Sequence, residues 1–136
     1  ILLTSDEREQ YEQQKRINMK AVHKKWLETV ADWYQCHGFS DSVLNEYQFQ
    51  IHHAVGRTAK HNKIAIGHWF VLPLPIALHD VSSNHAYNVT HHKHAFTERF
   101  ELQSELFQEM IESMRASEIT LPFDINVINA IMDTRK

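Results

Sequence analysis

Apolar residues near the start of the chain recur at steps of three and four, the spacing of a helix with one buried face. They are Met19, Val22, Trp26, Val30 and Trp33. This pattern predicts a long helix from about Asp6 to Tyr34, which Gly38 can end. The segment from Glu9 to Arg16 is polar nearly all round, so it predicts either a frayed helical end or a solvated arm that docks on a partner.

From Tyr47 the pattern changes to the alternation of a half-buried strand. Tyr47, Phe49 and Ile51 alternate with polar residues, which places His52 and His53 on opposite faces at the strand end. Residues 39–46 before this strand are predicted to form a connector with a short helical turn.

A second apolar strand is predicted from Ile64 to Leu74, so the two strands form a hairpin around a polar, basic loop at 56–63. Gly67 should interrupt this strand. Pro73 and Pro75 are predicted to stop it, because proline has no N–H group for a ladder of hydrogen bonds.

Helical spacing returns in the second half of the chain. Residues 76–79 predict a short helical turn, and residues 80–90 a polar loop. One long amphipathic helix should then bury six large apolar residues: Phe96, Phe100, Phe107, Met110, Ile111 and Met114. Asp124 is a good cap for a small terminal helix that carries Ile125, Ile128, Ile131 and Met132.

Together these elements predict one α+β domain over residues 1–136. It has a partly extended helix at 1–35, a β-hairpin finger at 47–100 and C-terminal helices at 93–136. No stretch is apolar enough for a membrane helix and no secretory leader is present, so we expect a cytosolic protein without a membrane partner. Cys36 is the only cysteine, which excludes an intrachain disulfide and leaves nitrogen and oxygen ligands for any metal.

Positive charge is concentrated in the middle of the chain, although the net charge is −3. Residues 52–99 carry five basic and two acidic side chains, whereas both flanking segments are acidic. Arg57, Lys60, Lys63 and Lys93 are therefore candidate contacts for the phosphate backbone of DNA. A solvated surface of a protein that binds no nucleic acid is the simpler alternative.

Histidine is the most distinctive residue of this central segment, because nine of the eleven histidines lie between His52 and His94. Neutral imidazole is the commonest nitrogen ligand of transition metals and the usual general base near neutral pH. An expression tag or a solvated loop can also be rich in histidine, but these histidines are dispersed among apolar, strand-like residues. The pattern therefore indicates a metal-dependent active site.

Two strands that carry histidines, followed by a short helix with another histidine, have the layout of a ββα-metal finger. The strings IHHAVGR, GHWFVLPLPIALHD and VTHHKHAFTERF, preceded by KKWLETVADWYQCHG, resemble the HNH nucleases of phages. The resemblance is closest to the recombination-enhancement, RecA-dependent nuclease family and covers roughly residues 24–114. It implies an HNH-like finger and a phage-encoded endonuclease that acts on DNA, with a RecA-type recombinase filament as a candidate partner.

The resemblance also assigns roles to individual residues. It makes His53 the general base, and His52, His79 and His91 the ligands of one divalent cation, which is zinc, magnesium or manganese. His92 and His94 are alternatives to His91, while three further histidines are predicted to be structural or at the surface: His23, His37 and His85.

The chain departs from the family pattern at three positions. Cysteines that are common in the family are replaced by Trp33 and Pro75. The asparagine that should orient the base histidine is replaced by Phe70, with His68 and Asn62 as imperfect substitutes nearby.

Three other functions fit parts of the sequence. A nuclease fold without catalysis would serve as a module that binds DNA or a recombinase. His79 followed by Asp80 suggests a metal-dependent phosphohydrolase, but that class needs an all-helical frame, which the strand pattern at 64–75 contradicts. A structural protein would use the histidines to hold zinc for stability alone. The sequence leaves the oligomeric state open.

Overall fold

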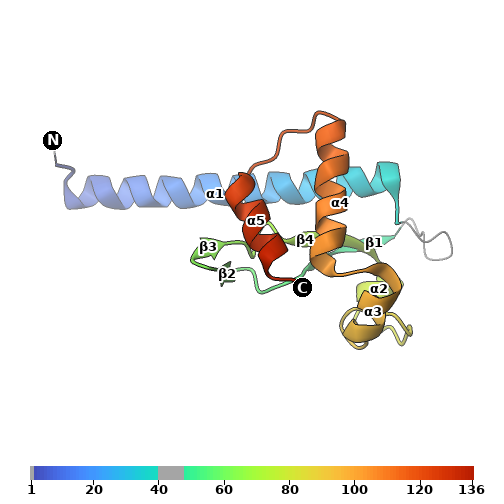
Figure 1. Ribbon diagram of the computed structural model, residues 1–136. Helices are drawn as coiled ribbons and strands as arrows, with labels where there is room; N and C mark the ends of the chain where they lie inside the picture. Colours follow the sequence, from blue (N-terminus) through green and yellow to red (C-terminus); the bar gives the residue numbers. More distant parts are fainter. Residues whose placement is uncertain (1, 40–47) are drawn as a thin grey trace.

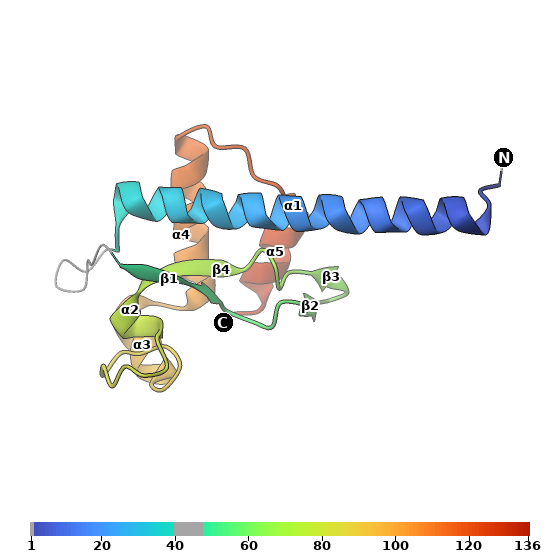
Figure 2. The same cartoon turned by 180° about the vertical axis from the view of Figure 1, so that it is seen from behind.

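The computed structural model describes residues 2–39 and 48–136, and Figures 1 and 2 show it from opposite sides. Its elements, in chain order, are α1 (Ser5–His37), β1 (Phe49–His53), β2 (Lys60–His61), β3 (Ile64–Ala65), β4 (Val71–Pro75), α2 (Ile76–His79), α3 (Lys93–Phe100), α4 (Gln103–Ala116) and α5 (Ile125–Asp133). The α+β class, the long first helix, the small hairpin sheet and the C-terminal helices are thus confirmed. None of the helices in these residues is long and apolar enough to span a membrane.

Helix α1 forms as the apolar spacing predicts, and its second half alone packs on the body. The Thr4 side chain accepts a hydrogen bond from the Glu7 N–H at 3.1 Å and so caps the helix start. Trp26, Val30 and Tyr34 are buried, whereas residues 2–21 are exposed. The first half of α1 therefore extends away from the other elements (Figure 1).

Strands β1 and β4 form an antiparallel two-stranded sheet, in which Ile51 lies opposite Pro73 and Phe49 opposite Pro75. The prediction that Pro73 stops the strand is wrong, because β4 continues through it and ends at Pro75. In a sheet of two strands every strand has an unpaired edge, and a proline is tolerated where its nitrogen faces that edge. The two prolines are two residues apart, so their nitrogens face the same side. The expected start of β1 at residue 47 lies outside the described residues.

The connection between β1 and β4 contains a second, smaller hairpin. Strands β2 and β3 pair antiparallel, so the apolar segment 64–74 is two short strands rather than one. Between them Gly67 packs directly on the backbone of Gly56 and Arg57. A Cβ atom on Gly67 would lie 2.1 Å from the Gly56 carbonyl oxygen, so only glycine fits there. The predicted connector at 39–46 falls almost wholly outside the described residues.

The short helix at 76–79 and the loop after it are confirmed, but the long helix predicted after residue 93 is two helices. The chain turns at Glu101, whose φ of 101° is not helical. This break lets α3 bury Phe96 and Phe100 while α4 buries a separate face. The predicted cap of the terminal helix is confirmed, because the Asp124 carboxylate accepts hydrogen bonds from two backbone N–H groups of α5.

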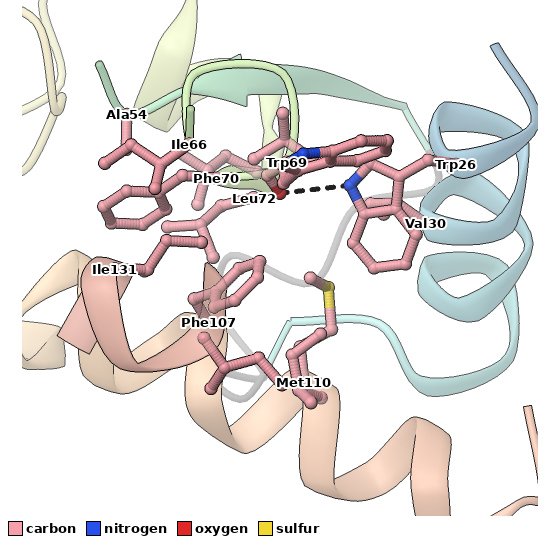
Figure 3. Packing of buried hydrophobic residues seen from close by; sticks show 14 of the residues in the cluster. Trp26, Val30, Ala54, Ile66, Trp69, Phe70, Leu72, Phe107, Met110 and Ile131 are labelled. Carbon is pink, nitrogen blue, oxygen red and sulfur yellow. Dashed lines mark hydrogen bonds between the residues drawn. The ribbon is translucent and has the colours of Figure 1, made fainter. Parts of the chain in front are cut away.

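The core lies where α1, α4 and α5 meet the sheet and the segment that precedes β4 (Figure 3). Trp26 of α1 reaches across it, and its indole Nε1–H donates a 3.0 Å hydrogen bond to the Trp69 carbonyl. Phe70, Phe107 and Ile131 are fully buried beside this contact. The core thereby fixes the segment that carries Gly67, His68 and Trp69 against α1.

Candidate functional site

Strand β1 presents different chemistry on its two faces. Gln50 and His52 alternate with Ile51 and His53, so the adjacent histidines point to opposite sides, as the strand period predicts. His52 contacts residues of α2 and α4, whereas His53 faces a cavity next to α1. The predicted metal ligand, His52, and the predicted general base, His53, therefore lie in two neighbouring but different environments.

His52 is held by the start of α4. Its Nε2 lies 2.8 Å from the Oε1 of buried Gln103, so Nε2–H donates and Nδ1 keeps a free lone pair. Burial lowers the pKa of His52 from 6.5 to about 4, although the hydrogen bond to Gln103 acts in the opposite direction. The imidazole is consequently neutral near pH 7, which is the form that binds a metal.

His79, at the end of α2, has an equally defined orientation. Its Nδ1 lies 2.7 Å from the Oε1 of Gln50, whose amide nitrogen donates to Asp80 at 3.3 Å. A carboxylate only accepts, which fixes the Gln50 amide and makes His79 Nδ1–H the donor. The Nε2 atom of His79 therefore keeps its lone pair. Burial lowers the pKa of His79, with an opposing effect from the Asp80 charge.

The His52 and His79 rings lie together, with centroids 5.0 Å apart and planes at 63°. Two imidazoles that share a tetrahedral cation, with nitrogens about 2.0–2.1 Å from it, have centroids about 5 Å apart. The centroid spacing allows a shared divalent cation, and both rings are neutral with one N–H group anchored. Among residues 2–39 and 48–136, no three His, Cys, Asp or Glu side chains are grouped around one point.

The predicted third ligand, His91, lies in the turn before α3. Its Nε2 donates to the Val81 carbonyl at 2.7 Å, which again leaves Nδ1 with a lone pair. Asn88 holds this turn against the end of α2. Its side-chain amide donates to the carbonyls of Ala77 and Asp80, and its Oδ1 accepts from the His91 N–H. His92 precedes α3 and is exposed, and the exposed His94 pairs with Glu98 at 2.9 Å.

On its other side, β1 ends beside a cavity of about 340 Å³ between α1 and the segment that follows β1. The cavity is lined by Lys20, His23, Lys24, Leu27, His53, Arg57 and His68. His23 and His68 stack with ring centroids 3.9 Å apart. Burial lowers the pKa of His53, and electrostatic interactions with Arg57, His68 and His79 lower it further.

The predicted DNA contacts separate into three places. Arg57 lines the cavity beside His53. Lys60 lies in β2 and is exposed, and Lys63 occupies the hairpin turn with a φ of 68°. Lys93 begins α3. Burial and then the Lys93 charge lower the pKa of Lys136, whose charge in turn acts on His52. The structure therefore groups Arg57 with the predicted base and places Lys93 near the His52 side.

The position expected to hold an orienting asparagine is part of the core, because Phe70 is fully buried. Asn62 turns away and donates to Asp133 of α5 at 3.3 Å. His68 does lie on the His53 side, where it stacks on His23. Among the described residues the His53 ring has no hydrogen-bond partner, so its orientation rests on packing alone.

The sequence pattern did not predict the glutamine partners of His52 and His79, or the place of His23 in the cavity wall. Gln50 could have been found, because it lies two residues before His52 and so shares its strand face. Gln103 gave no signal, since it is 51 residues from His52 and belongs to a helix start that the periodicity did not show. His23 is predicted to be structural or at the surface, and the structure places it in the wall of the cavity with His53.

Comparisons of the chain with protein-family models, with curated proteins and with solved structures find no match. The function is therefore inferred from the residues and their geometry.

Proposed function

We propose that this protein is a metal-dependent DNA endonuclease of the HNH type, which hydrolyses phosphodiester bonds. The observation that carries the proposal is the pair of neutral histidines, His52 and His79, with ring centroids 5.0 Å apart and the N–H of each donated to a glutamine. Anchoring of one ring nitrogen to a carbonyl is typical of metal-bound histidine. Supporting it is the order of the elements, since two antiparallel strands are followed by a short helix that ends at His79.

In this proposal the residues divide the work between the two faces of β1. His52 and His79 would hold a zinc, magnesium or manganese ion, with His91 as the predicted third ligand. A divalent cation supplies positive charge against the scissile phosphate and the leaving oxygen. His53 accepts the proton of the attacking water, a role that its lowered pKa suits because the ring is neutral at pH 7. Arg57 and Lys93 bind the DNA backbone on either side.

A second candidate function is a nuclease fold without catalysis that binds DNA or a recombinase filament and keeps a structural metal. The burial of Phe70 where an asparagine is expected favours it, together with the absence, among described residues, of a hydrogen bond to the His53 ring. A base that is not oriented loses much of its contribution to rate.

One cleavage experiment tests the proposal against this alternative. The protein is incubated with supercoiled and linear double-stranded DNA and with single-stranded DNA, in magnesium, manganese or zinc, with and without a RecA-type filament. We expect nicked or linear products that depend on the metal. Metal binding and DNA binding without cleavage in every condition would favour the catalytically inactive protein.

Matched histidine variants assign the roles. His53→Ala should lose cleavage by roughly 10² to 10⁴ in rate while it keeps metal affinity and folding. His79→Ala should lose metal and cleavage together. His37→Ala is the control, because His37 stacks on Trp33 at the far end of α1. This variant should cleave normally. If removal of metal unfolds the wild-type protein, the metal is structural. Normal cleavage by His53→Ala would contradict its role as the base.

A further inference from the structure

The cavity beside His53 has an unusual composition. Among the described residues that line it, five carry basic or imidazole side chains besides His53 and none is acidic: Lys20, His23, Lys24, Arg57 and His68. Within residues 2–39 and 48–136, no ion pair joins Lys20, Lys24 or Arg57 to a carboxylate. Cations that converge on a hollow without a counter-charge attract an anion, because their mutual repulsion falls when one binds.

The positive charge continues out of the cavity along α1. Residues 15–25 contain five Lys or Arg side chains and no Asp or Glu. Arg16, Lys20 and Lys24 are four residues apart and so share one face, at steps of about 6 Å along the helix. Two phosphate steps of B-DNA span about 6.8 Å of its axis, at about 3.4 Å each. The stripe therefore matches a polyanion with repeated charges better than a single free anion.

We propose that this cavity and the stripe Arg16, Lys20 and Lys24 form a binding site for the phosphodiester backbone of nucleic acid. The inference rests on the proposed function for its choice of ligand, and it deepens that function. It assigns to α1 a part of DNA binding, for which the sequence pointed only to Arg57, Lys60, Lys63 and Lys93. Lys20 and Lys24 approach the backbone from the helix, and Arg57 approaches it from the opposite wall.

Local packing holds the two walls of the cavity in place. Trp26 of α1 is bonded to the Trp69 carbonyl, directly after His68. Gly67 rests on the backbone of Gly56 and Arg57. The backbone that carries the lysines, Arg57 and His68 is therefore in place before any ligand binds, which reduces the ordering cost of binding to that of the side chains.

The test compares two double variants of the full chain that remove the same charge from the same helix. Lys20→Ala/Lys24→Ala removes the stripe, whereas Lys15→Ala/Lys25→Ala removes two lysines about 140° away around α1. Binding of a fluorescein-labelled 20-nucleotide DNA duplex is measured in EDTA across salt concentrations, so that cleavage plays no part. All four lysines are exposed, and circular dichroism checks that each variant folds.

For Lys20→Ala/Lys24→Ala we expect the salt slope to fall by about 0.9 per lost contact, with roughly a tenfold rise in Kd per contact at 0.1 M salt. The control variant should keep nearly the wild-type slope. Equal weakening in both variants, or no weakening in either, would overturn the proposal. Titration with inorganic phosphate, followed through the NMR signals of the histidine rings, separates a free-anion site from a backbone site. Phosphate binding without DNA binding would also overturn it.

The same variants separate this inference from the proposed nuclease. If the protein never cleaves DNA but its DNA binding depends on the stripe, the proposed binding site stands and the proposed nuclease activity is rejected. Cleavage by the Lys20→Ala/Lys24→Ala variant with unchanged KM and kcat supports the nuclease and rejects the site.

Discussion

Replacement of Gly67 by alanine tests the close approach of Gly67 to the backbone of Gly56 and Arg57, at the two ends of the connection between β1 and β4. A Cβ atom at this position would lie 2.1 Å from the Gly56 carbonyl oxygen and 2.3 Å from that of Arg57. Carbon and oxygen atoms that are not bonded stay about 3 Å or more apart, so one backbone segment must move by nearly 1 Å. Neither obstacle is a flexible side chain, so the strain cannot be relieved by a rotamer change.

The expected cost is that of forcing an extra group into a packed region, about 1–3 kcal/mol. For a chain of this length such a loss lowers Tm by on the order of 5–10 °C. Gly56→Ala is a matched control, because a Cβ on Gly56 meets nothing within 4 Å. Neither glycine has a positive φ, so the difference between the two variants reports the close approach and not backbone freedom.

Urea denaturation followed by tryptophan fluorescence measures both variants, and DNA binding in EDTA is measured in parallel. Gly67→Ala should lower the unfolding midpoint and weaken DNA binding, because relief of the clash moves the Arg57 backbone away from His68. Gly56→Ala should change neither quantity by more than a small amount. Equal midpoints for Gly67→Ala and wild type would refute the close approach and, with it, the account of how the cavity is held.

Three other predictions concern stability. In metal-free buffer the free energy of unfolding should fall by up to about 3 kcal/mol as pH drops from about 6.5 to 4. In this range the unfolded chain binds a proton at His52, whereas folded His52, with its pKa of about 4, does not. Urea melts at several pH values should show this slope, and His52→Asn should reduce it. Trp26→Phe should cost about 0.5–1.5 kcal/mol beyond the lost packing, because the Trp69 carbonyl keeps only its backbone donor, and thermal melts would measure it. Asp124→Ala removes the cap of α5 and should cost about 0.5–2 kcal/mol, with faster amide exchange in α5 than in α1; unchanged exchange would contradict the capping role.

The parts of the fold that the sequence predicted are those where local pattern and tertiary packing agree. The spacing of Trp26 and Val30 marks the face of α1 that is buried, and Asp124 marks the start of α5. The helix break at Glu101 could not be predicted, because no glycine or proline marks it and the apolar spacing continues across it. Packing of α3 and α4 on different elements imposes the break.

The candidate site was predictable only as far as its chemistry lies within one strand or one short helix. The strings IHHAVGR and GHWFVLPLPIALHD single out His52, His53 and His79, which lie at or next to the ends of β1 and α2. Their partners come from segments far apart along the chain, and Gln103 and His23 show this most clearly. Which residues of a helix face a distant loop depends on how the helix crosses it, and a sequence pattern does not contain that angle.

The two prolines of β4 also protect the free edge of the sheet. The Ala54 N–H donates to the Phe70 carbonyl, and the strand period gives residues 72 and 74 of β4 the same orientation toward β1. The nitrogens of Pro73 and Pro75 therefore face the opposite edge, which lacks the N–H donors that a further strand would need there. Prolines at such an edge act against edge-to-edge aggregation with strands of other chains.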